Sequence, residues 1–150
     1  MKIIDTLQER FAGRIEVWEK NARRIYLTVK KDDAKEVNWF IFNDLGGRFS
    51  TATGVDNPTA VEILYHFCLD QHNVILTVRV RLEKPILEIA SLAERLPAAE
   101  WVEREIHEMF GVTFTGHPQM ETLLLPEDWP AGVYPLRKNS FDSEKENEER

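Results

Sequence analysis

Apolar and polar positions recur with a period that changes along the chain. From Ile3 to Phe11 the apolar residues fall at helical spacing and Gly13 follows them, which predicts a short amphipathic helix over the first dozen residues. In the next stretch apolar and polar residues alternate, most clearly from Ile25 to Lys30. This alternation predicts two strands, over residues 14–19 and 23–30.

A second helix is expected between Asp33 and Gly46. Asp33 and Glu36 have the spacing of a capping pair at a helix start, and Gly46-Gly47 supplies a stop. The apolar residues between these signals lie on one helical stripe: Val37, Phe40, Ile41 and Leu45.

Three further strands are predicted over residues 48–55, 61–69 and 74–82. The polar residues 70–73 between the last two have the chemistry of a hairpin turn. In the last strand every second residue from Val74 to Leu82 is apolar, and Thr77, Arg79 and Arg81 face the other way. Such a strand has one covered and one wet face.

Residues 86–96 and 97–110 are predicted as two helices, separated at Pro97, because proline is tolerated in the first turn of a helix. Together these elements predict an α+β fold, with helices packed on one face of a mainly antiparallel sheet.

Regular periodicity ends after Phe110. Four prolines and three glycines interrupt large apolar side chains between residues 111 and 138, and long irregular segments of compact domains are usually functional. We therefore expect an α+β domain over residues 1–110, an extended partner-binding segment over 111–141, and a disordered charged tail over 142–150.

Composition narrows the classes of function. The 150 residues fit one domain, and the net charge is −7. No cluster of basic residues exceeds a pair, which argues against nucleic-acid binding. Cys68 is the single cysteine, so this chain by itself holds no disulfide and no iron-sulfur cluster, and we expect Cys68 to be a buried core residue.

Targeting signals are not evident. No stretch approaches the ~20 consecutive apolar residues of a membrane span, and Asp5 comes too early for a signal peptide. The chain is expected to be cytoplasmic and to reach a membrane only through partners.

The densest group of titratable residues lies in the last predicted helix. Glu103 and His107 are four residues apart and share a face, but the second histidine of a zincin motif is replaced by Gly111, and Arg104 stands where a di-iron motif needs glutamate. Acid-base catalysis by Glu103, Glu105 and His107 remains an open alternative, although no nucleophile or cofactor motif accompanies them.

A simpler interpretation is structural. Glu100 with Arg104, and Arg104 with Glu108, have the spacing of ion pairs along a helix. Further on, Gly116-His117-Pro118 predicts a chain bend that holds the imidazole rigidly, because glycine tolerates positive φ and proline keeps the preceding residue extended.

Taken together, residues 103–118, then Leu123-Leu124-Leu125-Pro126 and residues 129–138, resemble the signature of the complex I C-subunit family, the thirty-kilodalton subunit of respiratory-chain NADH dehydrogenase. Two positions depart from that pattern, Glu108 where the family usually has aspartate, and Glu121-Thr122 where a basic residue is common. The stretch 129–138 looks closer to the versions found in energy-converting and formate-hydrogenlyase-type hydrogenases.

The resemblance implies a function as well as a fold. Members of this family are similar in being cofactor-free subunits of a peripheral arm, placed against the D subunit, which descends from the large subunit of nickel-iron hydrogenases. Iron-sulfur clusters and, in a hydrogenase, nickel-iron then belong to partner subunits, and the complex lies on the cytoplasmic face of the cell membrane. The residues expected to bind partners are Glu103, Arg104, Glu105, Phe110, Gly116, His117, Pro118, Leu124, Trp129, Tyr134, Pro135, Leu136, Arg137 and Lys138.

Four interpretations stay open at this point. The subunit can belong to a hydrogenase complex, which the resemblance favours, or to an NADH:quinone oxidoreductase. The chain can also be a free-standing interaction module, or an independent small enzyme that uses the acidic helix.

Overall fold

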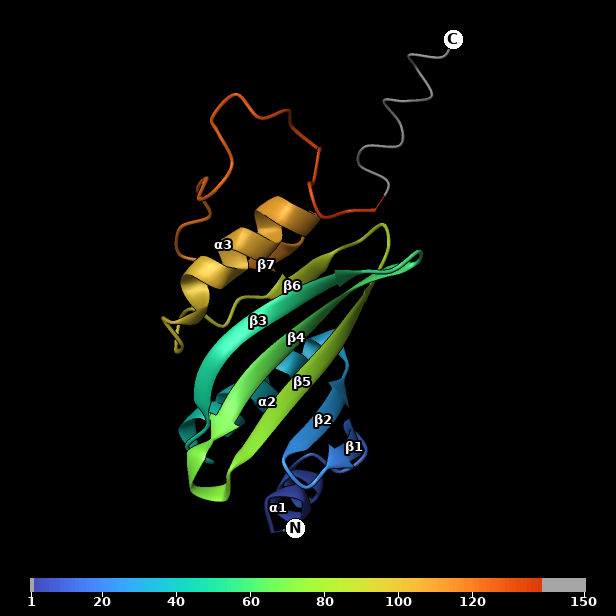
Figure 1. Cartoon of the computed structure of the whole chain (residues 1–150), viewed down its shortest axis with the longest axis vertical. Coiled ribbons are helices and arrows are strands. Elements are labelled where there is room, and N and C mark those ends of the chain that lie inside the picture. Colours follow the sequence, from blue (N-terminus) through green and yellow to red (C-terminus); the bar gives the residue numbers. More distant parts are fainter. Residues whose placement is uncertain (1, 139–150) are drawn as a thin grey trace.

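A five-stranded sheet forms the centre of the protein in the computed structural model, which describes residues 2–138 (Figure 1). The strand order is β1-β2-β5-β4-β3, and β2 and β5 run parallel while the other three neighbouring pairs run antiparallel. The predicted mainly antiparallel sheet is thus confirmed. The strands are β1 (Ile15–Asn21), β2 (Arg24–Val29), β3 (Arg48–Asp56), β4 (Ala60–Leu69) and β5 (Val74–Glu83).

Helices cover one face of this sheet, as predicted. α1 (Lys2–Arg10) and α2 (Lys31–Asn43) lie behind the strands in Figure 1, and α3 (Ala99–Phe110) lies beside β3. The turn between β4 and β5 is the short helix η1 (Asp70–His72), and Asn73 closes it with a φ of 53°. None of the helices described within residues 2–138 has the length and apolarity needed to cross a bilayer.

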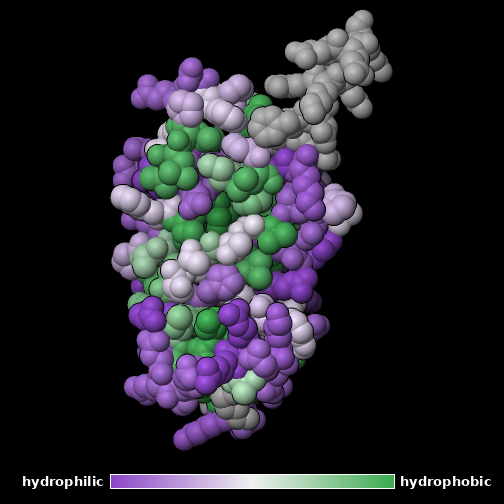
Figure 2. Space-filling view, in the orientation of Figure 1, coloured by the Kyte–Doolittle hydropathy of each residue, from purple (hydrophilic) through white to green (hydrophobic). Residues whose placement is uncertain are grey.

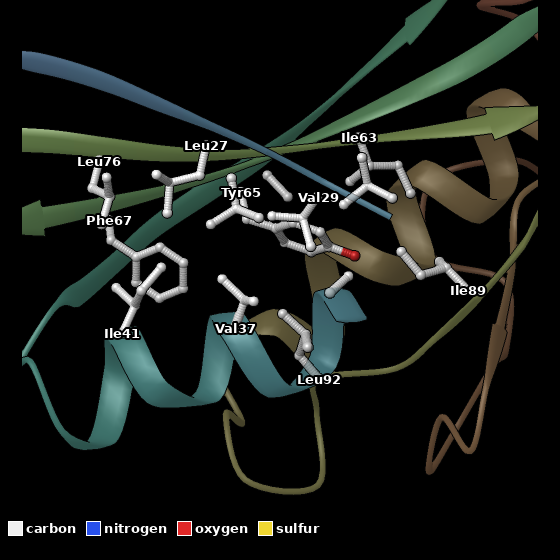
Figure 3. Packing of buried hydrophobic residues seen from close by; sticks show 14 of the residues in the cluster. Leu27, Val29, Val37, Ile41, Ile63, Tyr65, Phe67, Leu76, Ile89 and Leu92 are labelled. Atoms are coloured by element: carbon white, nitrogen blue, oxygen red, sulfur yellow. The ribbon is translucent and has the colours of Figure 1, made fainter. Parts of the chain in front are cut away.

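The core lies between the sheet and the helices. On β5 the side chains that alternate from Val74 to Leu82 are buried, as the sequence pattern predicted. Figure 3 shows Val37 and Ile41 of α2 pointing at Tyr65 and its neighbours on the sheet. Each fully buried aliphatic or aromatic side chain contributes about 1.5–3 kcal/mol, so this layer is the main source of stability.

The predicted capping pair of α2 is wrong. The helix begins at Lys31, and its N-cap residue makes no side-chain capping bond. Asp33 and Glu36 instead accept hydrogen bonds from Arg14, at the start of β1. A guanidinium offers both carboxylates stronger, charge-assisted bonds than the helix backbone does, and so ties α2 to the connection between α1 and β1.

The helix predicted over residues 86–96 is also wrong. This stretch contains the short strand β6 (Glu88–Ala90), which pairs in parallel with β7 (Thr113–Thr115). Leu87 and Ile89 are buried by this pairing and the stretch then turns toward α3. The partner strand β7 follows α3 in the sequence, so the local pattern of residues 86–96 could not predict this pairing. The helix predicted next is confirmed as α3, which begins at Ala99.

Cys68 does not lie in the core. It is half-buried on β4, on the face of the sheet opposite the helices, directly across from Ile75. Alternation along β4 dictates this position, because Phe67 and Leu69 on either side of it point into the core. The tail predicted to be disordered, residues 142–150, lies outside the described residues.

The position of α3 depends on one glycine. Gly54 of β3 faces the ring of Phe110, the last residue of α3, and a Cβ built on Gly54 would lie 2.6 Å from Cδ2 of that ring and nearer still to Cε2. Real Cβ atoms do not approach a neighbour this closely. The absence of a side chain at Gly54 therefore lets the end of α3 pack directly on the strand.

Glu103 holds the middle of the same helix. Its carboxylate is fully buried, and it accepts hydrogen bonds from Ser91 Oγ at 2.5 Å and from the backbone N–H of Leu92 at 2.7 Å. Burial raises the pKa of Glu103 to about 7, although both hydrogen bonds act in the opposite direction.

Gly54→Ala is expected to destabilise the chain by roughly 1–3 kcal/mol, because the new methyl group forces Phe110 or α3 to move. In a strand without this contact alanine would be more favourable than glycine, so a loss of stability can be attributed to the clash with Phe110. Urea unfolding measures it. Phe110→Ala combined with Gly54→Ala should cost less than the two single changes added together. If the free-energy costs of the two changes were additive, Gly54 and Phe110 would not be in direct contact.

Glu103→Gln is expected to flatten the dependence of stability on pH. Because the folded pKa is raised from 4.5 to about 7, the stabilising contribution of Glu103 is fully present below about pH 4.5 and is lost as the pH rises through about 7. The loss is on the order of 3 kcal/mol, and a neutral amide avoids it.

Unfolding free energies at pH 5 and pH 8 test this expectation. Glu105→Gln is the matched control, because Glu105 is an exposed glutamate on the same helix and its replacement should leave the pH dependence as in the wild type. An unchanged pH dependence in Glu103→Gln would contradict the assignment.

Candidate functional site

α3 presents three different faces to its surroundings. Glu103, Ile106 and Phe110 are buried against the sheet, whereas Trp101 and Glu105 are exposed. A third stripe, at positions 100, 104 and 108, faces the chain that follows β7. Positions four apart lie above one another on a helix, so this stripe is continuous along α3.

Arg104, in the middle of the stripe, holds the backbone of the following segment. Its Nε donates to the carbonyl oxygen of Glu121 at 3.0 Å, and its Nη2 donates to that of Thr122 at 2.9 Å. Residues 116–138, here called the C-terminal segment, have no helix or strand of their own. Their carbonyl groups therefore need donors from elsewhere in the chain.

Glu108 supplies the complementary acceptors. Its two carboxylate oxygens accept the backbone N–H groups of Leu123, at 2.6 Å, and Leu124, at 2.8 Å. The predicted ion pairs of Arg104 with Glu100 and Glu108 are therefore wrong. Both charged side chains are turned to the segment, where unpaired backbone groups offer stronger partners than a solvent-exposed ion pair would.

His117 attaches the beginning of the segment to the first turn of α3. The N–H of Gln119 donates to His117 Nδ1 at 3.0 Å, so the proton is on Nε2, which donates to the carbonyl oxygen of Glu100 at 2.9 Å. Gly116 has a φ of 77°, which allows the bend. The imidazole is held rigidly at a bend, as predicted. It faces α3, with its side chain 1% exposed and Nε2 3.9 Å from Glu103 Oε2.

The far end of the segment returns to the end of α3. Gly111 ends the helix with a φ of 77°. A Cβ built on Gly111 would lie 2.5 Å from Cε2 of Tyr134, so the tyrosine ring occupies the space that a side chain would need. The N–H of Leu136 donates to the carbonyl of Met109 at 3.1 Å. Arg137, one of the residues expected to bind a partner, donates to the carbonyl of Phe110 at 2.9 Å.

Asp56 attaches the last described residues to the sheet. At the end of β3, its buried carboxylate lies 2.6 Å from Lys84 Nζ and accepts the backbone N–H of Lys138 at 2.9 Å. Burial opposes its ionisation, but these two donors and Arg137 outweigh it and keep the pKa of Asp56 below its ordinary value. Nothing in the sequence marked this residue.

Between these attachments, residues 126–133 of the segment form a loop that is held by hydrogen bonds among its own residues. Trp129 Nε1 donates to the carbonyl of Val133 at 2.8 Å, and the Trp129 N–H donates to that of Pro126 at 3.0 Å. The indole is half-buried, and Pro118 nearer the start of the segment is exposed. Contact of these residues with a partner stays a prediction.

A hollow of about 360 Å³ opens between α3, β3 and the segment. Trp101 is 68% exposed and Leu124 is 59% exposed, and both line it. Figure 2 shows hydrophobic side chains gathered on this part of the surface, over α3 and the segment. We call this hollow the α3 groove, and its lining residues are Phe49, Ser50, Thr51, Ala98, Trp101, Val102, Glu105, Leu123 and Leu124.

The predicted partner-binding residues divide into two groups. Glu103 and Phe110 lie inside the chain, so they position α3, whereas Glu105, Leu124 and Leu136 face outward. Trp101 was missed. The available signal was a tryptophan on the polar face of an amphipathic helix that precedes an apolar irregular segment.

The side chains of Glu103, Glu105 and His107 on α3 do not point toward one shared site. Glu103 faces the core, Glu105 faces outward, and His107 Nδ1 donates to the carbonyl of Val112 at 2.8 Å. Among residues 2–138 no three histidine, cysteine or acidic side chains gather in a group that could hold a metal ion.

Known proteins share this arrangement of elements. A chain in the solved structure of the membrane-bound sulfane sulfur reductase (MBS), an archaeal respiratory membrane complex, superposes on this protein with a TM-score of 0.79 at 24% identity. The superposition covers 99% of this chain and 91% of the other. At that identity the likeness concerns the fold alone.

Sequence relatives are more informative. The C subunit of the F(420)H(2) dehydrogenase of Methanosarcina mazei is 36% identical over 141 residues, which are 91% of this chain and 89% of the relative. Formate hydrogenlyase subunit 5 of Escherichia coli is 34% identical over 142 residues. In that case the match covers 91% of this chain but 25% of the relative.

A family model agrees with the signature found in the sequence. The model described as respiratory-chain NADH dehydrogenase, 30 Kd subunit, matches residues 27–146, which include α3, the α3 groove and the whole C-terminal segment. The chain therefore belongs to the family of the 30 Kd subunit of respiratory-chain NADH dehydrogenase.

Proposed function

We propose that this chain is a cofactor-free structural subunit of the peripheral arm of a membrane-bound energy-converting nickel-iron hydrogenase complex, where the α3 groove docks the hydrogenase-large-subunit-like neighbour. Membership of the family and the similarity to formate hydrogenlyase subunit 5 support this proposal. The same subunit role in an NADH:quinone oxidoreductase is the alternative, which the name of the family supports.

The exposed indole of Trp101 beside Leu124 is the observation that carries the proposal. Large aromatic side chains are enriched among the few residues that dominate the affinity of protein interfaces, and Trp101, 68% exposed, lines one groove together with Leu124, 59% exposed. Glu105 at the rim of the groove offers a carboxylate to a basic residue of the neighbour.

The anchoring of the segment within its own chain favours binding. Hydrogen bonds that Arg104 and His117 donate and that Glu108 accepts hold the wall of the groove in place before any partner arrives. A partner then meets a preformed surface, so less conformational entropy is lost on association.

The match to formate hydrogenlyase subunit 5 supports a close neighbour. The region similar to this chain makes up 25% of that protein, so there it is joined covalently to a further, larger part. A permanent neighbour in one relative supports a stable, separate neighbour for this chain.

Metals and electron transfer are assigned in this proposal to the neighbours. The single cysteine of this chain cannot supply the several thiolates that an iron-sulfur cluster needs, so clusters and nickel-iron would belong to the large-subunit-like and iron-sulfur subunits. The chain would lie on the cytoplasmic face of the membrane, held there by these partners.

Trp101→Ala is expected to weaken association with the large-subunit-like neighbour at least about tenfold, because it removes a central aromatic contact of the groove. The matched control is Trp18→Ala, since Trp18 is a 59% exposed tryptophan on β1, at the opposite edge of the sheet from β3. Native purification through a tag placed after Arg150, with mass spectrometry of the recovered subunits, measures the difference.

Metal analysis of the same preparations separates the two complexes. A hydrogenase-like large subunit with iron and nickel supports the hydrogenase, whereas iron without nickel selects the NADH:quinone oxidoreductase. Recovery of the chain alone, or equal recovery of the neighbour by the Trp101 and Trp18 variants, would refute docking through the groove.

A further inference from the structure

The face of the sheet opposite the core carries a row of polar side chains. Tyr26, Thr77, His66 and Thr51 lie directly beside one another on four neighbouring strands, β2, β5, β4 and β3. No helix of the described chain covers this face (Figure 1). Around the row is a hollow of about 180 Å³, and its lining residues are Arg24, Tyr26, Ser50, Thr51, His66, Cys68, Ile75 and Thr77.

The charge inside this hollow is unbalanced. Its lining includes the basic residue Arg24 and no acidic residue. On the same sheet Arg48, Arg79 and Arg81 each form an ion pair with an acidic side chain, whereas within residues 2–138 Arg24 has no such acidic partner. A guanidinium surrounded by hydroxyl groups is suited to a ligand with negatively charged oxygen atoms.

His66 aligns the hydroxyl donors. Its ring nitrogens are both engaged, Nε2 with Thr53 Oγ at 3.0 Å and Nδ1 with Thr77 Oγ at 2.9 Å. Burial and then the positive charge of Arg24 lower the pKa of His66, so the ring is neutral at pH 7. If Nδ1 carries the proton and donates to Thr77, the Thr77 hydroxyl is free to donate into the hollow.

We propose that this hollow, the Arg24 pocket, binds a small oxyanion, a carboxylate or phosphate group, through the Arg24 guanidinium and the hydroxyl of Thr77. The volume is below the range of pockets that hold drug-sized ligands, so the ligand is one small charged group. Ser50 and Thr51 line both this pocket and the α3 groove.

The shared wall gives the ligand two possible sources. One is a free anion, and the other is an acidic side chain of a protein that occupies the neighbouring groove. The proposal does not rest on docking at the groove, because the binding of a small anion is measured on the isolated full chain.

Titration of the isotopically labelled full chain tests the pocket by NMR. Inorganic phosphate is added in one series and the side-chain carboxylate of N-acetyl-glutamate amide in another, both at constant ionic strength. We expect saturable shifts of the Thr51 and Thr77 amides and a signal of His66 with the proton on Nδ1. Arg24→Ala should weaken the binding at least about tenfold, since a charge-assisted contact is removed.

Arg23→Ala is the matched control. Arg23 is the preceding residue, also lacks an acidic partner within the described chain, and does not line the pocket. Saturation by phosphate alone supports a free anion, and saturation by the glutamate derivative supports an acidic side chain of a partner. Failure of both anions to saturate the wild type, or equal weakening by the Arg23 and Arg24 variants, would overturn the proposal.

Discussion

The direct packing of Phe110 on Gly54 determines where the other parts of the candidate site lie. A glycine in β3 lets the end of α3 come within van der Waals contact of a strand backbone, and the side-chain attachments of the C-terminal segment described above are made to α3 or to the end of β3. Protein interiors are packed too closely for such a contact to shift without effect on its neighbours. The groove beside Trp101 is therefore a consequence of a residue with no side chain.

Buried carboxylates perform a second structural task. Glu103, Glu108 and Asp56 are all less than a tenth exposed, and each accepts donors from a different part of the chain. A buried charge is costly unless several donors satisfy it, so each of the three specifies one arrangement of the chain around it. Glu103 is bound to the loop after β6, Glu108 to the segment, and Asp56 to the end of the segment and to Lys84.

These internal attachments leave a characteristic surface. The polar backbone of the segment is bound to α3, while Trp101 and Leu124 remain exposed above a preformed groove. The wall formed by Ser50 and Thr51 continues from this groove into the polar hollow at Arg24. The proposed apolar contact lies beside the proposed site for an anionic group, and this combination suits a permanent protein partner.

The sequence by itself determined the elements whose signals are local. Three such features could be recognised in the sequence alone: the apolar stripe of α1, the alternation along β5 and the family signature after Glu103. Helical and strand periodicity is set by neighbouring residues, so it can be detected without the structure. Tertiary structure decided which donors and acceptors meet. Residues 88–90 form the strand β6 because β7 lies within reach, and Arg104 and Glu108 bind the backbone of the C-terminal segment. A hydrogen bond between residues distant in the sequence depends on positions in space that no local pattern records.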